Sequence, residues 1–66
     1  MKLVVNGEET SVELSARTVA ALLAQRRPRP PFAVEVNRNL VRRPQYDQTP
    51  LRDGDRVEIV TLVGGG

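Results

Sequence analysis

The sequence predicts an α+β fold in which a mixed sheet carries one main helix on one face. Alternation of apolar and polar residues indicates short strands in both halves of the chain. Between them lies a single segment whose apolar residues recur at helical spacing. At 66 residues the chain is expected to form one small domain with a mostly aliphatic core.

The N-terminal part is expected to form a β-hairpin. Residues 2–6 alternate as a first strand, and Asn6-Gly7 is a strong signal for a tight turn, because both residues tolerate positive φ. Residues 9–14 then return as a second strand, with Val12 and Leu14 on its inner face.

The helix is expected over residues 18–26. Thr18 is a plausible N-cap, since its hydroxyl can accept a hydrogen bond from an amide of the first turn. Val19, Leu22 and Leu23 form one apolar stripe. Pro28 ends the helix, because proline neither donates a backbone hydrogen bond nor fits a helix interior.

The second half of the chain reads as further strands joined by turns. Residues 32–36 are a third strand, and the last strand is expected to lie parallel to the first in the middle of the sheet. The remaining expectations are a turn at 37–39, a short strand at 40–41, one helical turn near 44–47, a buried Leu51, a turn at 53–55 and a last strand at 56–63.

Composition excludes several classes of function. The chain has neither Cys nor His, so it lacks the usual ligands for zinc, haem and iron–sulfur clusters. The net charge of +2 comes with interspersed acids and bases, and a single pair of aromatic residues does not favour nucleic-acid binding. Neither a signal peptide nor a membrane span is predicted, which favours a cytoplasmic protein. We read residues 26–31, rich in Arg and Pro, as a helix terminator and a stiff loop.

Gly64, Gly65 and Gly66 directly follow the last predicted strand. Glycine has no Cβ, so this segment is thin and conformationally free. Three residues extend roughly 10 Å at 3.3–3.6 Å each, far enough to carry the carboxylate of Gly66 into a narrow active site. There the carboxylate could attack the α-phosphate of ATP. The sequence therefore predicts a domain at 1–63 and a flexible tail at 64–66 that bears the reactive group.

The chain ends with the segment Val60-Thr61-Leu62-Val63-Gly64-Gly65-Gly66. This segment resembles the end of the ThiS family of sulfur carriers of thiamin thiazole synthesis, and the resemblance extends over the whole chain. Arg42 is a departure, since members often have Pro there. Further matching pieces, in family order, are Val5-Asn6-Gly7, Thr18-Val19, Leu22-Leu23, Val36-Asn37, Val41, Arg43, Tyr46, Leu51 and Asp53-Gly54-Asp55.

The resemblance implies a ubiquitin-like β-grasp roll and a covalent role for Gly66. A ThiF-type (E1-like) enzyme would adenylate the Gly66 carboxylate with its own ATP and Mg, and sulfur from a cysteine desulfurase or another donor would replace the adenylate. The resulting thiocarboxylate would supply sulfur to a ThiG-type thiazole synthase. The carrier would then be a cosubstrate, not an enzyme, with no catalytic residue, bound cofactor or metal of its own.

A docking surface for these partners is expected beside the tail. Strand alternation places Val57, Ile59 and Thr61 on the face that the helix covers. The opposite face would then carry an exposed apolar patch, and such patches often mark partner sites. The residues expected in it are Val4, Val60 and Leu62, with Val63 at the start of the tail.

Other functions are compatible with the same tail. A MoaD-type carrier, which delivers sulfur to molybdopterin, uses the same fold and the same glycine thiocarboxylate. A ubiquitin-like modifier would use the same adenylate to join Gly66 to lysines of other proteins. A binding module without covalent chemistry is the remaining alternative, and it would tolerate loss of Gly66.

Overall fold

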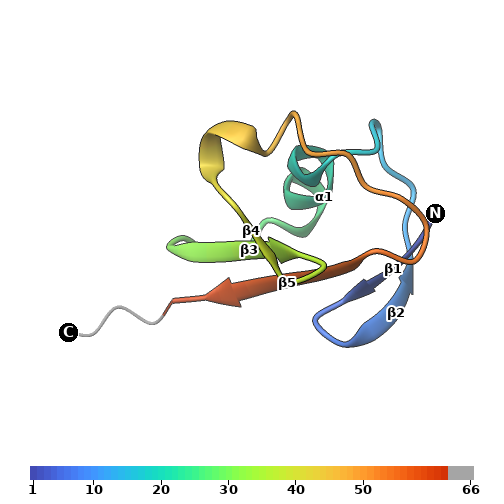
Figure 1. Ribbon diagram of the computed structural model, residues 1–66, viewed down its shortest axis with the longest axis horizontal. Helices are drawn as coiled ribbons and strands as arrows, with labels where there is room; N and C mark the ends of the chain where they lie inside the picture. Colours follow the sequence, from blue (N-terminus) through green and yellow to red (C-terminus); the bar gives the residue numbers. More distant parts are fainter. Residues whose placement is uncertain (63–66) are drawn as a thin grey trace.

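Five strands form one mixed sheet in the order β2-β1-β5-β3-β4. The computed structural model describes residues 1–62 (Figure 1). β5 is the central strand, parallel to β1 and antiparallel to β3. This β-grasp arrangement confirms the predicted fold class and the predicted pairing of the first and last strands. The elements are β1 (Lys2–Val5), β2 (Glu8–Ser11), α1 (Val19–Arg26), β3 (Phe32–Val36), β4 (Asn39–Val41), the short 3-10 helix η1 (Arg43–Gln45) and β5 (Arg56–Thr61).

Helix α1 ends at the predicted residue and has the predicted cap, but it begins at Val19, one residue later than predicted, because Thr18 is the N-cap. The Thr18 hydroxyl accepts a hydrogen bond of 3.2 Å from the amide of Ala21, which satisfies one of the free N–H groups of the first turn. Arg27 ends the helix in the left-handed conformation, with φ 50°, and donates its N–H to the Leu23 carbonyl at 2.7 Å. Pro28 follows, so the helix cannot continue.

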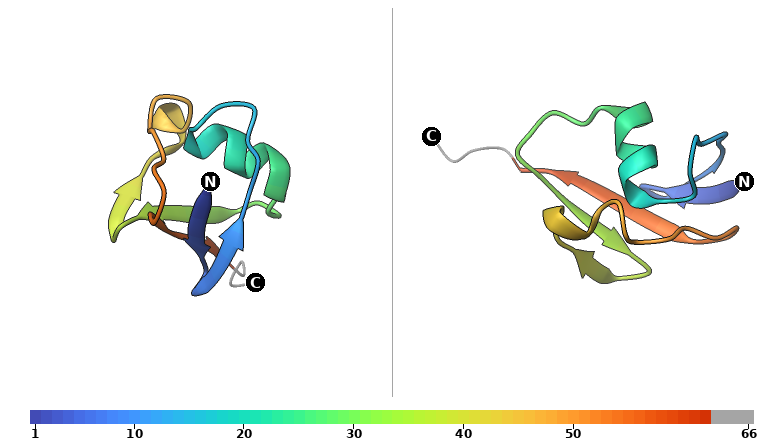
Figure 2. Two further views of the ribbon diagram at one scale, coloured as in Figure 1. Left: turned by 90° about the vertical axis from the view of Figure 1, so that its right-hand side faces the viewer. Right: turned by 90° about the horizontal axis from the view of Figure 1, so that it is seen from above.

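The core lies between α1 and one face of the sheet, as the two views of Figure 2 show. All three residues of the predicted helical stripe are buried. Leu51, in the segment between η1 and β5, is 2% exposed and belongs to the core, so its predicted burial is confirmed. The buried side chains are Leu3, Val5, Val12, Val19, Leu22, Leu23, Val34, Val36, Val41, Leu51 and Val57.

The two N-terminal strands are shorter than predicted, because the hairpin register limits them. Asn6 has φ 50° and belongs to the turn, so β1 ends at Val5. β2 ends at Ser11, and just beyond it Val12 still exchanges backbone hydrogen bonds with Met1, at 2.9 and 3.1 Å. Leu14 lies beyond the reach of β1 and is not in a strand, although its side chain is half-buried against the core, as expected.

β3 has the predicted bounds, β4 and the short helix after it begin one residue earlier than predicted, and β5 begins at the predicted Arg56. Asn37 and Arg38 have φ of 50° and 70° and form a two-residue hairpin turn. Asn39 therefore pairs with Val36 and is the first residue of β4. The helical turn is η1, and Arg42 before it is extended, with φ −88° and ψ 153°. β5 ends at Thr61, and residue 63 of the predicted strand lies outside the described residues.

Candidate functional site at the end of strand β5

Strand β5 carries the chain to the end of the molecule opposite the N-terminus (Figure 1). The ladder with β3 continues to its last residue, where Thr61 lies opposite Phe32. One residue further, the Leu62 N–H donates to the carbonyl of Pro31 at 2.8 Å. The chain is therefore held in the sheet up to Leu62. The predicted tail residues Gly64, Gly65 and Gly66, together with Val63, lie outside the described residues.

On its other side, β5 is held by a side chain where strand β1 stops. The Asn6 N–H donates to the Val57 carbonyl at 2.9 Å. Two residues along, the Ile59 N–H donates to Asn6 Oδ1 at 2.7 Å, and Asn6 Nδ2 donates to the Ile59 carbonyl at 3.3 Å. The Asn6 carboxamide thus makes the two backbone hydrogen bonds that a further residue of β1 would make. It holds β5 at Ile59, one residue before Val60. Asparagine also tolerates the positive φ of this position.

We expect Asn6→Gly to loosen the end of β5 while leaving the fold intact. Glycine accepts the positive φ, so the substitution removes the two side-chain hydrogen bonds without adding backbone strain. Two net hydrogen bonds correspond to about 1–3 kcal/mol. Hydrogen exchange of the Ile59 amide measures the effect, with Gly7→Ala as a control that strains the same turn but leaves the carboxamide. An unchanged exchange rate at Ile59 in Asn6→Gly would show that the carboxamide does not hold the strand.

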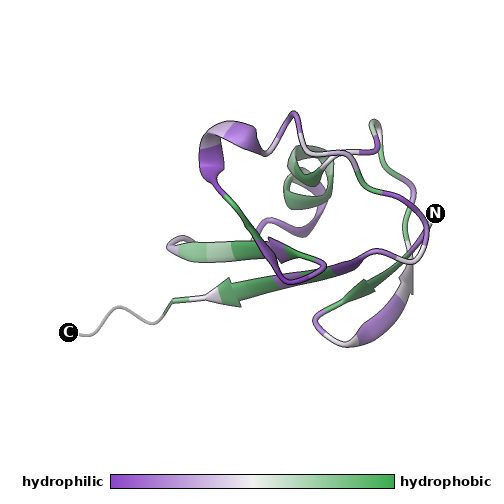
Figure 3. Ribbon diagram, in the orientation of Figure 1, coloured by the Kyte–Doolittle hydropathy of each residue, from purple (hydrophilic) through white to green (hydrophobic). Residues whose placement is uncertain are grey.

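Two apolar side chains stand on the open face of the sheet near the end of β5. Val60 is 49% exposed and Leu62 is 47% exposed, as the alternation predicts. In Figure 3, β5 changes from hydrophilic in its first part to hydrophobic toward its end. The register places Ala33 of β3 directly opposite Val60, so the two side chains share this face. Ala33, Val60 and Leu62 are called the exit patch below.

Val4 does not belong to this patch, contrary to the sequence-based expectation. The register of the parallel pair places Val4 opposite Arg56, not opposite Val60. The four intervening residue steps amount to roughly 13 Å along β5 at 3.3 Å per residue. Val4 is also half-buried and lies opposite Glu9 of β2. The sequence shows which strand is the neighbour but not the stagger between the two strands, and this is why the prediction failed.

The helix-covered face of β5 agrees with prediction for two of its three residues. Val57 is fully buried, and Ile59 is half-buried against the core. Thr61 is exposed, although it has the same phase. Thr61 is the last residue of β5, near the end of the sheet. Alternation predicts which face of the sheet a side chain lies on, but it does not predict how far along the strand the helix covers that face.

Comparison with known proteins identifies the family. The model of the ThiS family matches residues 2–66, which is almost the entire chain. The chain belongs to the ThiS family. Of the two carrier types left open by the sequence, ThiS and MoaD, the match is to ThiS. It includes the glycine triplet that the structure does not describe.

Solved structures of ThiS-family proteins share the fold of this chain. A crystal structure of the thiamine biosynthesis protein ThiS from Geobacter metallireducens is 34% identical, with a TM-score of 0.82 and full coverage of both chains. A solution NMR structure of a thiamine biosynthesis protein from the same organism is 33% identical, with the same TM-score, and covers 100% of this chain and 88% of the other.

A curated relative is a longer protein. The thiazole synthase of Paramagnetospirillum magneticum is 45% identical over 71 aligned positions, which include all of this chain. The chain spans about a fifth of the length of that relative. The relative therefore contains a ThiS-like stretch within a protein named as a thiazole synthase.

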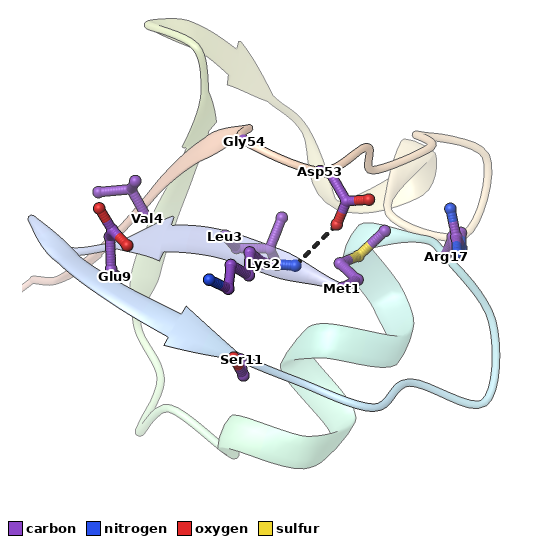
Figure 4. A pocket seen from close by; sticks show the side chains of 9 residues that line it. All are labelled: Met1, Lys2, Leu3, Val4, Glu9, Ser11, Arg17, Asp53 and Gly54. Atoms are coloured by element: carbon purple, nitrogen blue, oxygen red, sulfur yellow. Dashed lines mark hydrogen bonds between the residues drawn. The ribbon is translucent and has the colours of Figure 1, made fainter.

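A hollow of this ThiS-family chain lies far from the exit patch. It measures about 710 Å³ and lies around β1 and the turn before β5, where Asp53 Oδ1 accepts the Lys2 N–H at 2.7 Å (Figure 4). Within residues 1–62 no group of three acidic side chains gathers as a possible metal site. No helix in that part of the chain is long and apolar enough to cross a bilayer. The hollow has Met1, Leu3 and Val4 in its lining and shows no constellation typical of catalysis.

Sequence reasoning missed the most exposed large apolar residue of the described chain. Leu40 on β4 is 55% exposed, whereas its neighbour Val41 is buried. It lies opposite Glu35 on β3. Ala33, two residues before Glu35 on the same strand, is on the same open face of the sheet. Alternation could have found it, because a buried Val41 requires Leu40 to point the other way.

Proposed function

We propose that this chain carries sulfur for thiamin thiazole synthesis on the α-carboxylate of Gly66. The observation that carries the proposal is membership of the ThiS family over residues 2–66, glycine triplet included. The fixed end of β5 supports it, because a held strand gives a thin tail a defined starting point. A tail of glycines then meets the steric demand of a narrow active site.

The proposed chemistry has two steps. A carboxylate oxygen of Gly66 attacks the α-phosphorus of ATP, the bond to pyrophosphate breaks, and an acyl adenylate forms. A sulfur nucleophile, delivered by a cysteine desulfurase or another donor, then attacks the acyl carbon and AMP leaves. If the nucleophile is the outer sulfur of a donor persulfide, an acyl disulfide forms, and attack by a thiol on the donor sulfur then breaks the S–S bond and leaves that thiol and the donor joined as a disulfide. The released product is a glycine thiocarboxylate, which free sulfide would form directly.

The partners supply the catalytic groups in this proposal. The chain contains no His and no Cys, so it lacks the residues most used for proton transfer near neutral pH and for thiol chemistry. A ThiF-type enzyme would bind ATP and Mg and perform the adenylation. The carrier is therefore a cosubstrate, and its own contribution is to present the tail. Cytoplasmic location follows from the proposed use of ATP and a cysteine desulfurase.

A ThiG-type thiazole synthase is the proposed acceptor of the sulfur. The support is the curated relative, in which a stretch similar to this chain lies within a protein named as a thiazole synthase. Joining two modules in one chain raises their effective concentration for each other. The relative thus fits a pair of modules that act together, which we propose for this chain and a separate synthase.

The exit patch is the proposed docking surface for the adenylating enzyme. Val60 and Leu62 lie shortly before the glycine tail in the sequence, and about half of each side chain is exposed. Apolar side chains that are buried on binding contribute roughly 25 cal/mol per Å² of surface removed from water. A contact at this position would orient the tail as well as add affinity.

Val60→Asp is expected to weaken binding to a ThiF-type enzyme at least about tenfold, or 1.4 kcal/mol, with the fold unchanged. The side chain is 49% exposed, so aspartate remains solvated in the free carrier but would be desolvated in the complex. Isothermal titration calorimetry measures the dissociation constant, and circular dichroism checks the fold. Ser11→Asp adds the same charge on the distant strand β2 and should leave affinity unchanged. Equal affinity for Val60→Asp and the unmodified chain would exclude the exit patch as the docking surface.

Adenylation tests the proposed function itself. Purified ThiF-type enzyme with Mg-ATP should exchange labelled pyrophosphate into ATP only when this chain is present. Exchange that is independent of the chain, or absent with it, would refute the first step.

A further inference from the structure

The outer edge of strand β4 presents backbone groups that point away from the sheet. Asn37 donates its N–H to the Arg56 carbonyl at 2.7 Å, so the backbone groups of residue 37 face β5. Successive residues alternate in direction, so those of Val36 face β4 and those of its partner Asn39 face β3. The N–H and C=O of Leu40 therefore point outward. Because β4 is the last strand in the sheet order, they lie on an open edge.

The side chains along this edge are apolar in the centre and basic at both ends. Leu40 is 55% exposed on the open face. Arg42 follows in an extended conformation two residues later, hence on the same face, and Arg38 lies in the turn before β4. Both arginines are exposed. Residues 38–42 include no acidic residue, and Glu35 lies one strand inward, opposite Leu40.

This charge pattern disfavours pairing of the edge with a second copy of itself. Antiparallel pairing centred on Leu40 would place Arg42 of one copy opposite Arg38 of the other. Like charges directly opposite one another on neighbouring strands are destabilising. Basic residues on an edge strand are a common means of preventing such self-association. The same pattern attracts a strand of opposite charge.

We propose that the β4 edge binds an extended segment of a partner protein, which adds to the sheet as a sixth strand. Its backbone would pair with the outward N–H and C=O of Leu40, and its apolar side chain would lie beside that of Leu40. Acidic side chains two residues before and after would lie opposite Arg42 and Arg38. Main-chain hydrogen bonds provide affinity in this mode of recognition, and alternate side chains provide specificity.

A groove extends this edge toward the end of β5. It measures about 640 Å³, and Leu40, Arg42 and Pro31 are among its lining residues. Phe32 and Tyr46 also line it, and their rings stack with centroids 6.4 Å apart. An added strand that continues past Arg42 would enter this groove and bury an apolar side chain there. The β4 edge and this groove consist of residues outside the glycine tail, so binding there does not require sulfur chemistry.

Titration with a short peptide tests the proposal. The probe is acetyl-Thr-Glu-Thr-Val-Thr-Glu-Thr-amide, in which the apolar residue and both acids lie on one face, and the control peptide has Lys in place of Glu. In ¹H–¹⁵N NMR spectra of the full chain, the largest shifts are expected at the amides of Leu40 and Arg42, with slower hydrogen exchange at Leu40. The Lys peptide should bind at least about tenfold more weakly.

Charge reversal gives the matched variants. Arg42→Glu should reverse the preference between the two peptides, whereas Arg52→Glu, the same change at an exposed position outside β4, should not. Equal binding of both peptides, shifts centred on β2, or the same response from the two variants would overturn the proposal. So would absence of binding at several millimolar peptide, or concentration-dependent broadening at Leu40 without peptide, which would show self-pairing.

Discussion

A chain that lacks Gly66 is expected to fold normally and to lose all ability to support thiamin-independent growth of a strain without its own carrier. The sheet and core described for residues 1–62 are built without residue 66, so we expect the shortened chain to keep them. The deletion shortens the tail by about 3.5 Å, which is more than the precision that a reacting carboxylate requires. Pyrophosphate exchange with the ThiF-type enzyme should fall to the level seen without carrier.

Two further variants separate the length of the tail from its chemistry. A chain with one extra glycine after Gly66 keeps the glycine carboxylate but moves it outward by about 3.5 Å, and we expect it to be inactive as well. Gly66→Ala keeps the length and adds a Cβ beside the acid, so a partial loss is expected. Full growth with the shortened chain would rule out a covalent role for Gly66.

Leu22→Ala is expected to destabilise the fold by about 2–5 kcal/mol. The Leu22 side chain is on α1 and is fully buried in the core between the helix and the sheet. The cavity left by its truncation cannot fill unless the helix moves. A domain of this size loses about 4–8 °C of melting temperature per kcal/mol, and its total stability is of the same order as the expected loss. Thermal denaturation followed by circular dichroism measures the change.

Leu40→Ala is the matched control for Leu22→Ala. It removes the same atoms from a side chain that is 55% exposed, so the expected change is within about 0.5 kcal/mol. Comparable losses of stability in the two variants would contradict the assignment of the core.

Local signals in the sequence were sufficient for the helix and for β3. Thr18 caps α1 and Arg27, before Pro28, ends it, and each of these effects acts within one turn of chain. The bounds of β3 follow from alternation between a proline-rich loop and a turn. Such features depend on neighbours in sequence, so they can be predicted without knowledge of the fold.

The ends of the other strands and the exact neighbours in the site depend on register. The carboxamide of Asn6 binds the backbone of Ile59, 53 residues away, and the sequence shows it only as a turn residue. Val4 lies opposite Arg56 because of the stagger between β1 and β5, which no local pattern encodes. For the same reason Ala33, opposite Val60, could not be recognised as part of the exit patch.

Intact-protein mass spectrometry can show whether Gly66 carries a sulfur atom. The full chain is incubated with a ThiF-type enzyme, Mg-ATP, a cysteine desulfurase and cysteine, and is then fragmented to locate any change. We predict a mass increase equal to the exchange of one oxygen for one sulfur, confined to Gly66. An unchanged mass with an active enzyme and donor, or sulfur located on any other residue, would contradict it.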